Sequence, residues 1–320
     1  MSVMPPAGWD REESPFHAGE VAIQRRLGID EKVDRAGRRM IRTYMPDQHR
    51  AFFAQLPFIL IGSVDATGQP WASLLAGRPG FLDTPDDRSL TIAAQPLPGD
   101  PATLVPGAAI GLLGIEPPTR RRNRANGIVT QVGAAGITVA IQQSFGNCPK
   151  YIQARTPEPV EAAPGPPRVS SGLNAADRAL IAAADTFFIA TAHLSGEASG
   201  GADVSHRGGK PGFVRVEGNR LTVPDFIGNF LFNTLGNLAL EPRAGLLFPD
   251  YAAGDLLYLA ATGEIIWDGP ELATFEGAQR LMRLDVTRAI RLPGALPFRW
   301  SAPDYSPALE RTGVWMPERP

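Results

Sequence analysis

The sequence predicts a mainly β protein with peripheral helices, built from two tandem six-stranded barrels. The chain has 320 residues, more than one typical domain, and 43% of them are hydrophobic, enough for ordinary globular cores. Apolar, β-rich runs bounded by turn residues recur along the chain. A helix, a hairpin and further strands come twice in the same order, at a nearly constant separation of about 130 residues.

The first copy begins with a short helix. We expect this helix over 46–56, with Asp47 as its cap. The apolar runs 58–64 and 69–76 flank a turn and therefore predict a hairpin. Further strands are expected at 89–93, 108–115, 126–132 and 136–142.

The second copy repeats this order. Asn174 is placed to cap a helix through Ala184, and the runs 187–192 and 198–204 predict a second hairpin. Because six strands with alternating faces usually close to remove exposed edges, each copy is expected to form a barrel, and the two barrels to pack as a pseudo-dimer.

The expected organisation has five parts. They are an N-terminal helical arm (1–45), a first barrel (46–157), a proline-rich linker (158–172), a second barrel (173–293) and a C-terminal tail (294–320).

Composition excludes several classes of protein. The net charge of -2 gives no general attraction to nucleic acid or to anionic membranes. A single cysteine excludes an intrachain disulfide, and the four scattered histidines give no structural zinc pattern, so no metal is expected. The sequence lacks a signal peptide and an apolar stretch long enough to cross a membrane, so we expect a cytoplasmic protein.

Polar side chains gather at strand ends of the second copy. Asp203, Ser205 and Arg207 lie near the end of one predicted strand, and Asp225 ends the next. The helix-like stretch that follows contains the remaining candidates, Asn229, Asn233 and Thr234. Strand ends that converge with a helix N-terminus can bind an anion, but turns and a capped helix would give the same pattern.

Three further features have competing interpretations. Asn147, Cys148 and Lys150 lie in a loop that closes the first copy, where the thiol lacks an adjacent base and is expected to contact a cofactor or to be structural rather than nucleophilic. The arginine-rich stretch 120–124 is interpreted as a solvated strand edge, with a phosphate contact as the alternative. His17 is interpreted as the cap of the helix that follows it.

Several motifs resemble one known family, the pyridoxamine 5'-phosphate oxidase-related flavin-nucleotide-binding proteins. The resemblance covers 46–157 and 173–293. It is carried by DVSHRGGKPGFVRV, PDFIGNFLFNTLGNLALEPRAGLLF, RRRNRANG and QSFGNCPKYIQAR. It implies split barrels that bind FMN at the interface between two barrels. It further implies that the flavin is held by Asn147, Cys148, Lys150, Asp203, Ser205, Arg207, Asp225, Asn229, Asn233 and Thr234.

The chain also departs from the family pattern. The stretch 225–229 lacks the Arg-Lys pair of the oxidase proper, and 76–80 of the first copy lacks the Asp and Ser of the second. We therefore expect at most one complete site per chain, and no oxidation of vitamin B6. Arg207→Ala is expected to weaken flavin binding more than Arg122→Ala.

The resemblance implies an FMN-dependent oxidoreductase of unknown substrate, with FAD or a deazaflavin as alternative cofactors. NAD(P)H or a small redox molecule would be the partner, and the chain would be a monomer or a homodimer. A non-catalytic flavin carrier and a scaffold without cofactor are the other hypotheses. No residue of the sequence is identified as catalytic.

Overall fold

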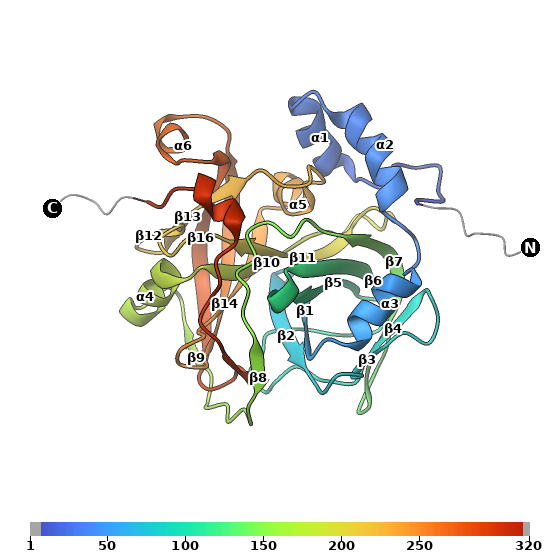
Figure 1. Cartoon of the computed structure of the whole chain (residues 1–320), viewed down its shortest axis with the longest axis horizontal. Helices are drawn as coiled ribbons and strands as arrows, with labels where there is room; N and C mark the ends of the chain where they lie inside the picture. Colours follow the sequence, from blue (N-terminus) through green and yellow to red (C-terminus); the bar gives the residue numbers. More distant parts are fainter. Residues whose placement is uncertain (1–7, 316–320) are drawn as a thin grey trace, which may run out of the picture.

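Two antiparallel β-sheets lie side by side in the computed structural model, which describes residues 8–315. Helices are few and lie at the periphery (Figure 1), so the predicted fold class, mainly β with peripheral helices, is confirmed. Residues 1–7 of the expected N-terminal arm and 316–320 of the expected tail lie outside the described residues.

The first sheet holds seven strands in the order β2-β1-β5-β6-β7-β4-β3. These strands are β1 (Phe58–Val64), β2 (Pro70–Ala76), β3 (Leu82–Asp83), β4 (Ser89–Ile92), β5 (Ala109–Glu116), β6 (Arg121–Gly133) and β7 (Gly136–Gly146).

The second sheet has the order β11-β10-β14-β15-β16-β13-β12, with β9 paired to β16 as an eighth strand. Its strands are β9 (Arg168–Ser170), β10 (Thr186–His193), β11 (Gly201–Gly208), β12 (Arg215–Glu217), β13 (Arg220–Phe226), β14 (Arg243–Pro249), β15 (Leu256–Ile266) and β16 (Ala278–Leu292).

The remaining elements surround the sheets. The helices are α1 (Ala18–Arg26), α2 (Asp30–Met40), α3 (Asp47–Ala54), α4 (Ala175–Ala183), α5 (Asn233–Leu240) and α6 (Pro270–Thr274), with 3-10 turns η1 (Pro117–Thr119) and η2 (Pro307–Arg311). The expected linker contributes β9 and part of β8 (Pro157–Pro159), and β8 pairs with β17 (Phe298–Trp300) of the expected tail. No helix of the described part of the chain is long and apolar enough to span a membrane.

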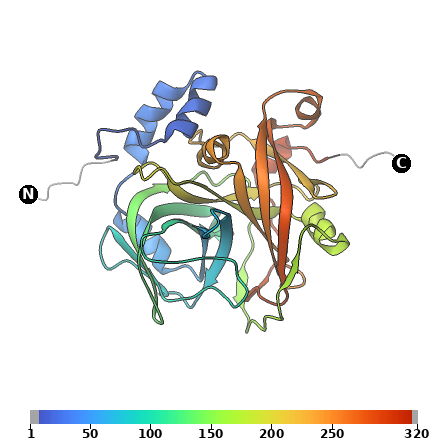
Figure 2. The same cartoon turned by 180° about the vertical axis from the view of Figure 1, so that it is seen from behind.

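Strand for strand, the two sheets follow the same order. Each contains one more strand in line than the six expected, because the short strands β3 and β12 extend one end. Figure 2 shows from behind how each sheet curls around its own interior. Whether an internal duplication produced this likeness stays a prediction.

Two expectations about helix starts have different outcomes. Asn174 caps α4, because its side chain accepts a hydrogen bond from the backbone N–H of Asp177, as predicted. Asp47 does not cap α3. Pro46 is the cap residue and supplies no side-chain hydrogen bond, while Asp47 is already the first helical residue.

Strand β6 begins earlier than predicted. It starts at Arg121 rather than near 126, and it lies between β5 and β7 in the interior of its sheet. The interpretation of 120–124 as a solvated strand edge is therefore wrong for most of the stretch, because Asn123 and Arg124 are buried. Arg121 alone among the arginines of β6 is exposed.

Three hydrophobic clusters hold the sheets together. One fills the interior of each sheet, and the third lies between the sheets, where Trp71 and Leu74 pack with Phe188, Leu247 and Tyr258. A buried side chain of this size contributes roughly 1.5–3 kcal/mol by leaving water. The third cluster fixes the two sheets relative to each other, and with them any site built from both.

Glycines allow the two sheets to approach at two corresponding points. A Cβ on Gly111 of β5 would lie 2.7 Å from the carbonyl oxygen of Ala202 in β11, and one on Gly245 of β14 would lie 2.1 Å from that of Pro70 in β2. Real Cβ atoms do not come so close to backbone, so both positions require glycine. The two contacts are related by the common strand order of the sheets.

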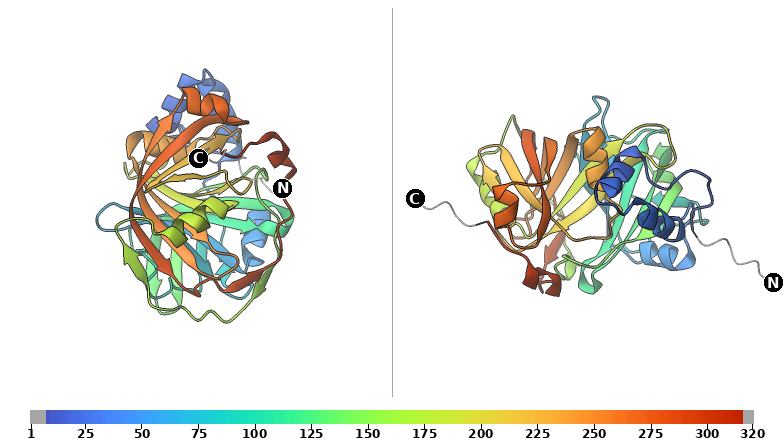
Figure 3. Two further views of the ribbon diagram at one scale, coloured as in Figure 1. Left: turned by 90° about the vertical axis from the view of Figure 1, so that its left-hand side faces the viewer. Right: turned by 90° about the horizontal axis from the view of Figure 1, so that it is seen from above.

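The N-terminal arm lies on helix α5 of the second half (Figure 3). Gly19 of α1 and Gly236 of α5 sit where the helices touch, since a Cβ on Gly19 would lie 2.1 Å from the Gly236 carbonyl oxygen. His17 caps α1 through Nδ1, which accepts from the Gly19 N–H, and this confirms the predicted capping role. The arm thereby supports the helix that begins at Asn233.

Candidate functional site

A cavity of about 980 Å³, including the space at its mouth, lies where residues of both sheets meet. All but one of the predicted site residues line it, namely Asn147, Cys148, Lys150, Ser205, Arg207, Asp225, Asn229, Asn233 and Thr234. The exception, Asp203, is buried behind the wall, where it holds Arg124.

Two arginines of the second sheet share one carboxylate in this cavity. Nη1 of Arg207, from β11, lies 2.5 Å from Oδ1 of Asp225, and Nε of Arg280, from β16, lies 3.5 Å from its Oδ2. The pKa of Arg280 is lowered. Burial is the main cause and the charge of Arg207 adds to it, while Asp225 acts in the opposite direction. The expected phosphate site therefore has basic groups, although they come from neighbouring strands rather than from 225–229.

Several buried donors in the cavity lack a hydrogen-bond partner within residues 8–315. Among them are Nε of Arg207, Nη1 of Arg280 and Nδ2 of Asn147. An unpaired buried donor costs about 1–3 kcal/mol, and more when it is charged, so native structures seldom keep one without a reason. Unpaired donors on residues that line a cavity suit an anionic ligand, whose oxygens accept hydrogen bonds.

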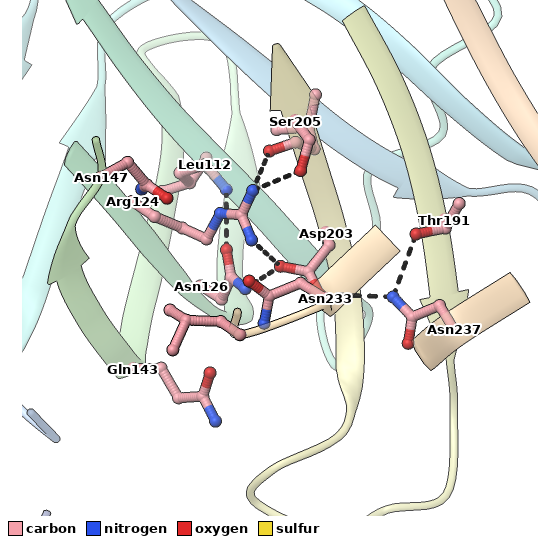
Figure 4. Close-up of polar contacts among 12 residues, drawn as sticks. Leu112, Arg124, Asn126, Gln143, Asn147, Thr191, Asp203, Ser205, Asn233 and Asn237 are labelled. Carbon is pink, nitrogen blue, oxygen red and sulfur yellow. Dashed lines mark hydrogen bonds and ion pairs between the residues drawn. The ribbon is translucent and has the colours of Figure 1, made fainter. Parts of the chain in front are cut away.

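Arg124 is clamped at the base of the cavity (Figure 4). Its guanidinium donates to Oδ1 of Asp203 at 3.0 Å, and to the carbonyl of Val204 and the hydroxyl of Ser205 at 2.8 and 2.5 Å. Nδ2 of Asn126 donates to the same Asp203 oxygen at 2.6 Å. Removing one partner from such a buried pair costs about 3–5 kcal/mol, so this network fixes the first sheet against β11.

Arg122 also faces the cavity, which corrects its expected place on a solvated edge. It lines the cavity wall, and its Nε donates to the carbonyl oxygen of Cys148 at 2.8 Å. Its Nη1 lies 3.4 Å from Nδ1 of His206. Burial lowers the pKa of Arg122 to about 10, helped by the neighbouring charges of Arg124 and Arg207, while Cys148 raises it.

Three aromatic residues that line the cavity have strained backbone. Tyr151, Phe230 and Phe232 line the cavity and have φ of 65°, 62° and 64°, a region that non-glycine residues seldom adopt. The Tyr151 hydroxyl donates to the Ile227 carbonyl at 3.1 Å and so joins the two loops that carry these rings. Strain of about 1–3 kcal/mol per residue is typical of ligand clamps.

The loop after β7 contributes a backbone carbonyl and polar side chains to the cavity. Cys148 is half-buried and contributes its carbonyl oxygen to Arg122, and Lys150 is exposed at the cavity rim. Asn147 faces Asn229 of the other loop, and Nδ2 of Asn229 donates to Oδ1 of Asn147 at 3.4 Å.

Glu20 of the N-terminal arm was missed in the sequence, and it reaches the site from outside. Its Oε1 accepts a hydrogen bond of 2.6 Å from Nδ2 of Asn233, a cavity residue. Burial, followed by the nearby Asp203, raises its pKa well above the usual range of a carboxyl. Glu20 and Arg280 could not be assigned to the site because no local pattern links them to it, whereas Arg122 and Arg124 belong to the stretch 120–124, for which a phosphate contact was the alternative interpretation.

The corresponding position of the first half is filled by protein. When the paired strands of the two halves are matched by their register, Ser73 takes the position of Ser205, and Tyr258 takes the position of Arg124. Between them lies the carboxyl of Asp100, which accepts from the Ser73 hydroxyl at 2.7 Å and from the Tyr258 hydroxyl at 2.8 Å. Burial raises the pKa of Asp100. A carboxyl group of the chain itself thus bridges the two residues of this position, whereas Arg124 and Ser205 bond to each other directly.

No family model matches the chain, and neither does any curated protein. Solved structures with similar parts include a candidate pyridoxamine 5'-phosphate oxidase from Lactobacillus delbrueckii, at 16% identity and TM-score 0.31, covering 38% of this chain and 94% of that one. HupZ of Group A Streptococcus has 12% identity and TM-score 0.29, covering 36% and 89%. An FAD-binding protein of Mesorhizobium loti has 10% identity and TM-score 0.26, covering 39% and 97%.

Proposed function

We propose that the cavity binds a flavin nucleotide, and FMN in particular. The observation that carries the proposal is the pair Arg207 and Arg280, whose buried donors lack partners within residues 8–315, in a cavity also lined by aromatic rings. Guanidinium groups suit a phosphate, and aromatic rings suit a flat isoalloxazine. FAD and a deazaflavin nucleotide are the alternatives with the same two chemical features.

In this proposal Arg207, Arg280 and Asn147 hold the phosphate. Asp225 orients the two arginines, and Asn229, Asn233 and Thr234 supply the other polar contacts of the cavity. Asp203 acts indirectly, by holding Arg124 and through it Ser205. A bound flavin supplies hydride or electron transfer, so the protein needs to bind and orient it.

The proposed activity is an oxidoreductase that uses NAD(P)H or a small redox molecule, and the alternative is a flavin carrier without turnover. The visible spectrum of freshly purified protein and the mass of the extracted cofactor test whether a flavin is bound and which one. NAD(P)H consumption with and without added acceptors then separates enzyme from carrier. A colourless protein that binds none of FMN, FAD or a deazaflavin on titration would leave only a scaffold role.

The phosphate assignment is tested with Arg207→Ala. Losing a charge-assisted contact of about 1.5–3 kcal/mol should weaken FMN binding roughly ten- to a hundredfold. Riboflavin, which lacks the phosphate, should bind the variant and the wild type alike. Arg122 is unsuitable as the control because it lines the cavity, so Arg121→Gln, on the exposed side of the same strand, takes its place. Equal FMN affinities in both variants would refute the assignment.

We further propose that the two halves arose by duplication, with boundaries near 46–157 and 173–293, and that one chain works as a pseudo-dimer in the cytoplasm. Light scattering during size-exclusion chromatography distinguishes a monomer from a homodimer.

A further inference from the structure

Arg122 differs from the other arginines of the cavity in having no acidic partner within residues 8–315. Arg124 is paired with Asp203, and Arg207 and Arg280 share Asp225. The polar contacts of Arg122 in this part of the chain are instead a carbonyl oxygen and the His206 ring. Its Nη2 makes no hydrogen bond or ion pair to the same residues.

The cavity contains more positive charge than one phosphate balances. Five cations line it, Arg122, Arg124, Lys150, Arg207 and Arg280, and they exceed the two carboxylates Asp225 and Asp203 by three charges. His206 adds none, because burial, Arg122 and Arg207 keep its pKa well below the ordinary value. A phosphate monoester carries about 1.5–2 negative charges near neutral pH, so about one positive charge stays unbalanced.

The unbalanced charge lies on the side of the first sheet. Arg122 is on β6 and Lys150 is in the loop after β7, whereas Arg207 and Arg280 are on strands of the second sheet. Arg122 is half-buried, and an anion on this side would pair its charge, which no carboxylate within residues 8–315 does. The carbonyl of Cys148 and the ring of His206 hold the Arg122 guanidinium ready for it.

We propose that Arg122 and Lys150 form a second oxyanion subsite, which takes the carboxylate or phosphate of a small molecule beside the flavin nucleotide. This inference rests on the proposed flavin function and deepens it. It identifies the second occupant, a substrate or a co-ligand, as an anion small enough to share the cavity with FMN.

The test uses the full chain saturated with FMN. Acetate and inorganic phosphate are titrated separately while the flavin absorption spectrum is recorded, and the two probes distinguish a carboxylate from a phosphate preference. Arg122→Gln should weaken binding of the preferred anion about tenfold or more, since it removes a charge-assisted contact. Arg121→Gln, the neighbouring position on the exposed side, should bind the anion like the wild type.

Several outcomes would overturn the subsite and leave the flavin proposal standing. These are no response to either anion, equal anion binding by the two variants, or an FMN loss in Arg122→Gln as large as in Arg207→Ala. The last result would mean that one phosphate engages all the arginines.

If the chain binds no flavin, the flavin proposal fails and calorimetry with phosphate decides the subsite. A phosphate site that Arg122→Gln removes and Arg207→Ala keeps supports it. A single site that Arg122→Gln leaves unchanged overturns it.

Discussion

At the scale of single residues, the charge of the cavity depends on which arginines are paired with a carboxylate. Asp225 pairs two arginines, Asp203 pairs one, and Arg122 is held by neutral groups. The charge needed for an anion comes from residues far apart in the sequence, which only strand pairing brings together. Arg280 meets Asp225 because β13 pairs with β16.

The residues after β7 provide a prediction about chemistry. Cys148→Ser should keep most of the flavin and most of any NAD(P)H oxidation, because the structure uses the Cys148 carbonyl and the substitution preserves it. Lys150→Ala should do more damage, because it removes a positive charge from the cavity. Flavin content and NAD(P)H consumption of both variants check this. A Cys148→Ser protein that keeps its flavin but loses turnover would make the thiol a participant.

At the scale of elements, helix α3 provides a prediction about pH. Burial lowers the pKa of His49 to about 4 from 6.5, helped by Arg42 and Arg121. Between these pH values the unfolded chain binds more protons than the folded one, so stability is lost as the pH falls from 6.5 to 4. His49 contributes up to about 3 kcal/mol of this loss.

Replacing His49 removes that contribution. Urea unfolding of the wild type and His49→Gln at several pH values should show a flatter decline for the variant. His17, whose pKa is also lowered to about 4, remains in both proteins. Parallel stability curves would show that His49 does not titrate in this way.

The contact between α1 and α5 provides a second prediction at this scale. In a helix, Gly→Ala usually stabilises by about 0.5–1 kcal/mol. In Gly236→Ala, however, the new Cβ would lie 2.7 Å from the backbone N of Glu20, which is too close. Overpacking of this kind costs about 1–3 kcal/mol, which exceeds the gain in helix propensity, so the substitution should destabilise the protein.

Because α5 also carries Asn233 and Thr234, Gly236→Ala should weaken FMN binding as well. Thermal unfolding and FMN titration measure the two effects. Gly133→Ala is the matched control, since a Cβ there meets nothing within 4 Å. A Gly236→Ala protein as stable as this control would contradict the argument.

The elements that the sequence predicts well are those determined locally. The apolar run 58–64 matches β1, and Asn174 caps α4 through its own neighbours. The early part of β6 was missed because Asn123 and Arg124 are polar, and only contact with the other sheet makes a buried strand of them. Hydrophobic periodicity cannot register a partner that lies about 80 residues away.

At the scale of the whole molecule, the same limit explains what was found of the cavity. The candidates on β11, β13 and α5 share one stretch of chain, so their clustering was visible in the sequence. The contributions of α1, β6 and β16 depend on how the two sheets and the N-terminal arm pack. Glu20 on α1 lies more than 200 residues from Asn233, the residue that it orients.

The arrangement of both halves predicts the binding stoichiometry. We expect one flavin per chain, because Asp100 occupies the corresponding position of the first half, between Ser73 and Tyr258. Absorbance of the bound flavin against protein concentration measures the ratio. Two flavins per chain would show that Asp100 does not close that position.

The matching contacts of Gly111 and Gly245 show that the two halves pack against each other in the same way. They differ at the position that is Arg124 in one half and Tyr258 in the other. In an assembly of two identical chains, any replacement at such a position would appear twice. Here the two positions belong to one polypeptide and can mutate separately. Selection can therefore refine the cavity on one side and give up its counterpart on the other, a freedom that a symmetric homodimer lacks.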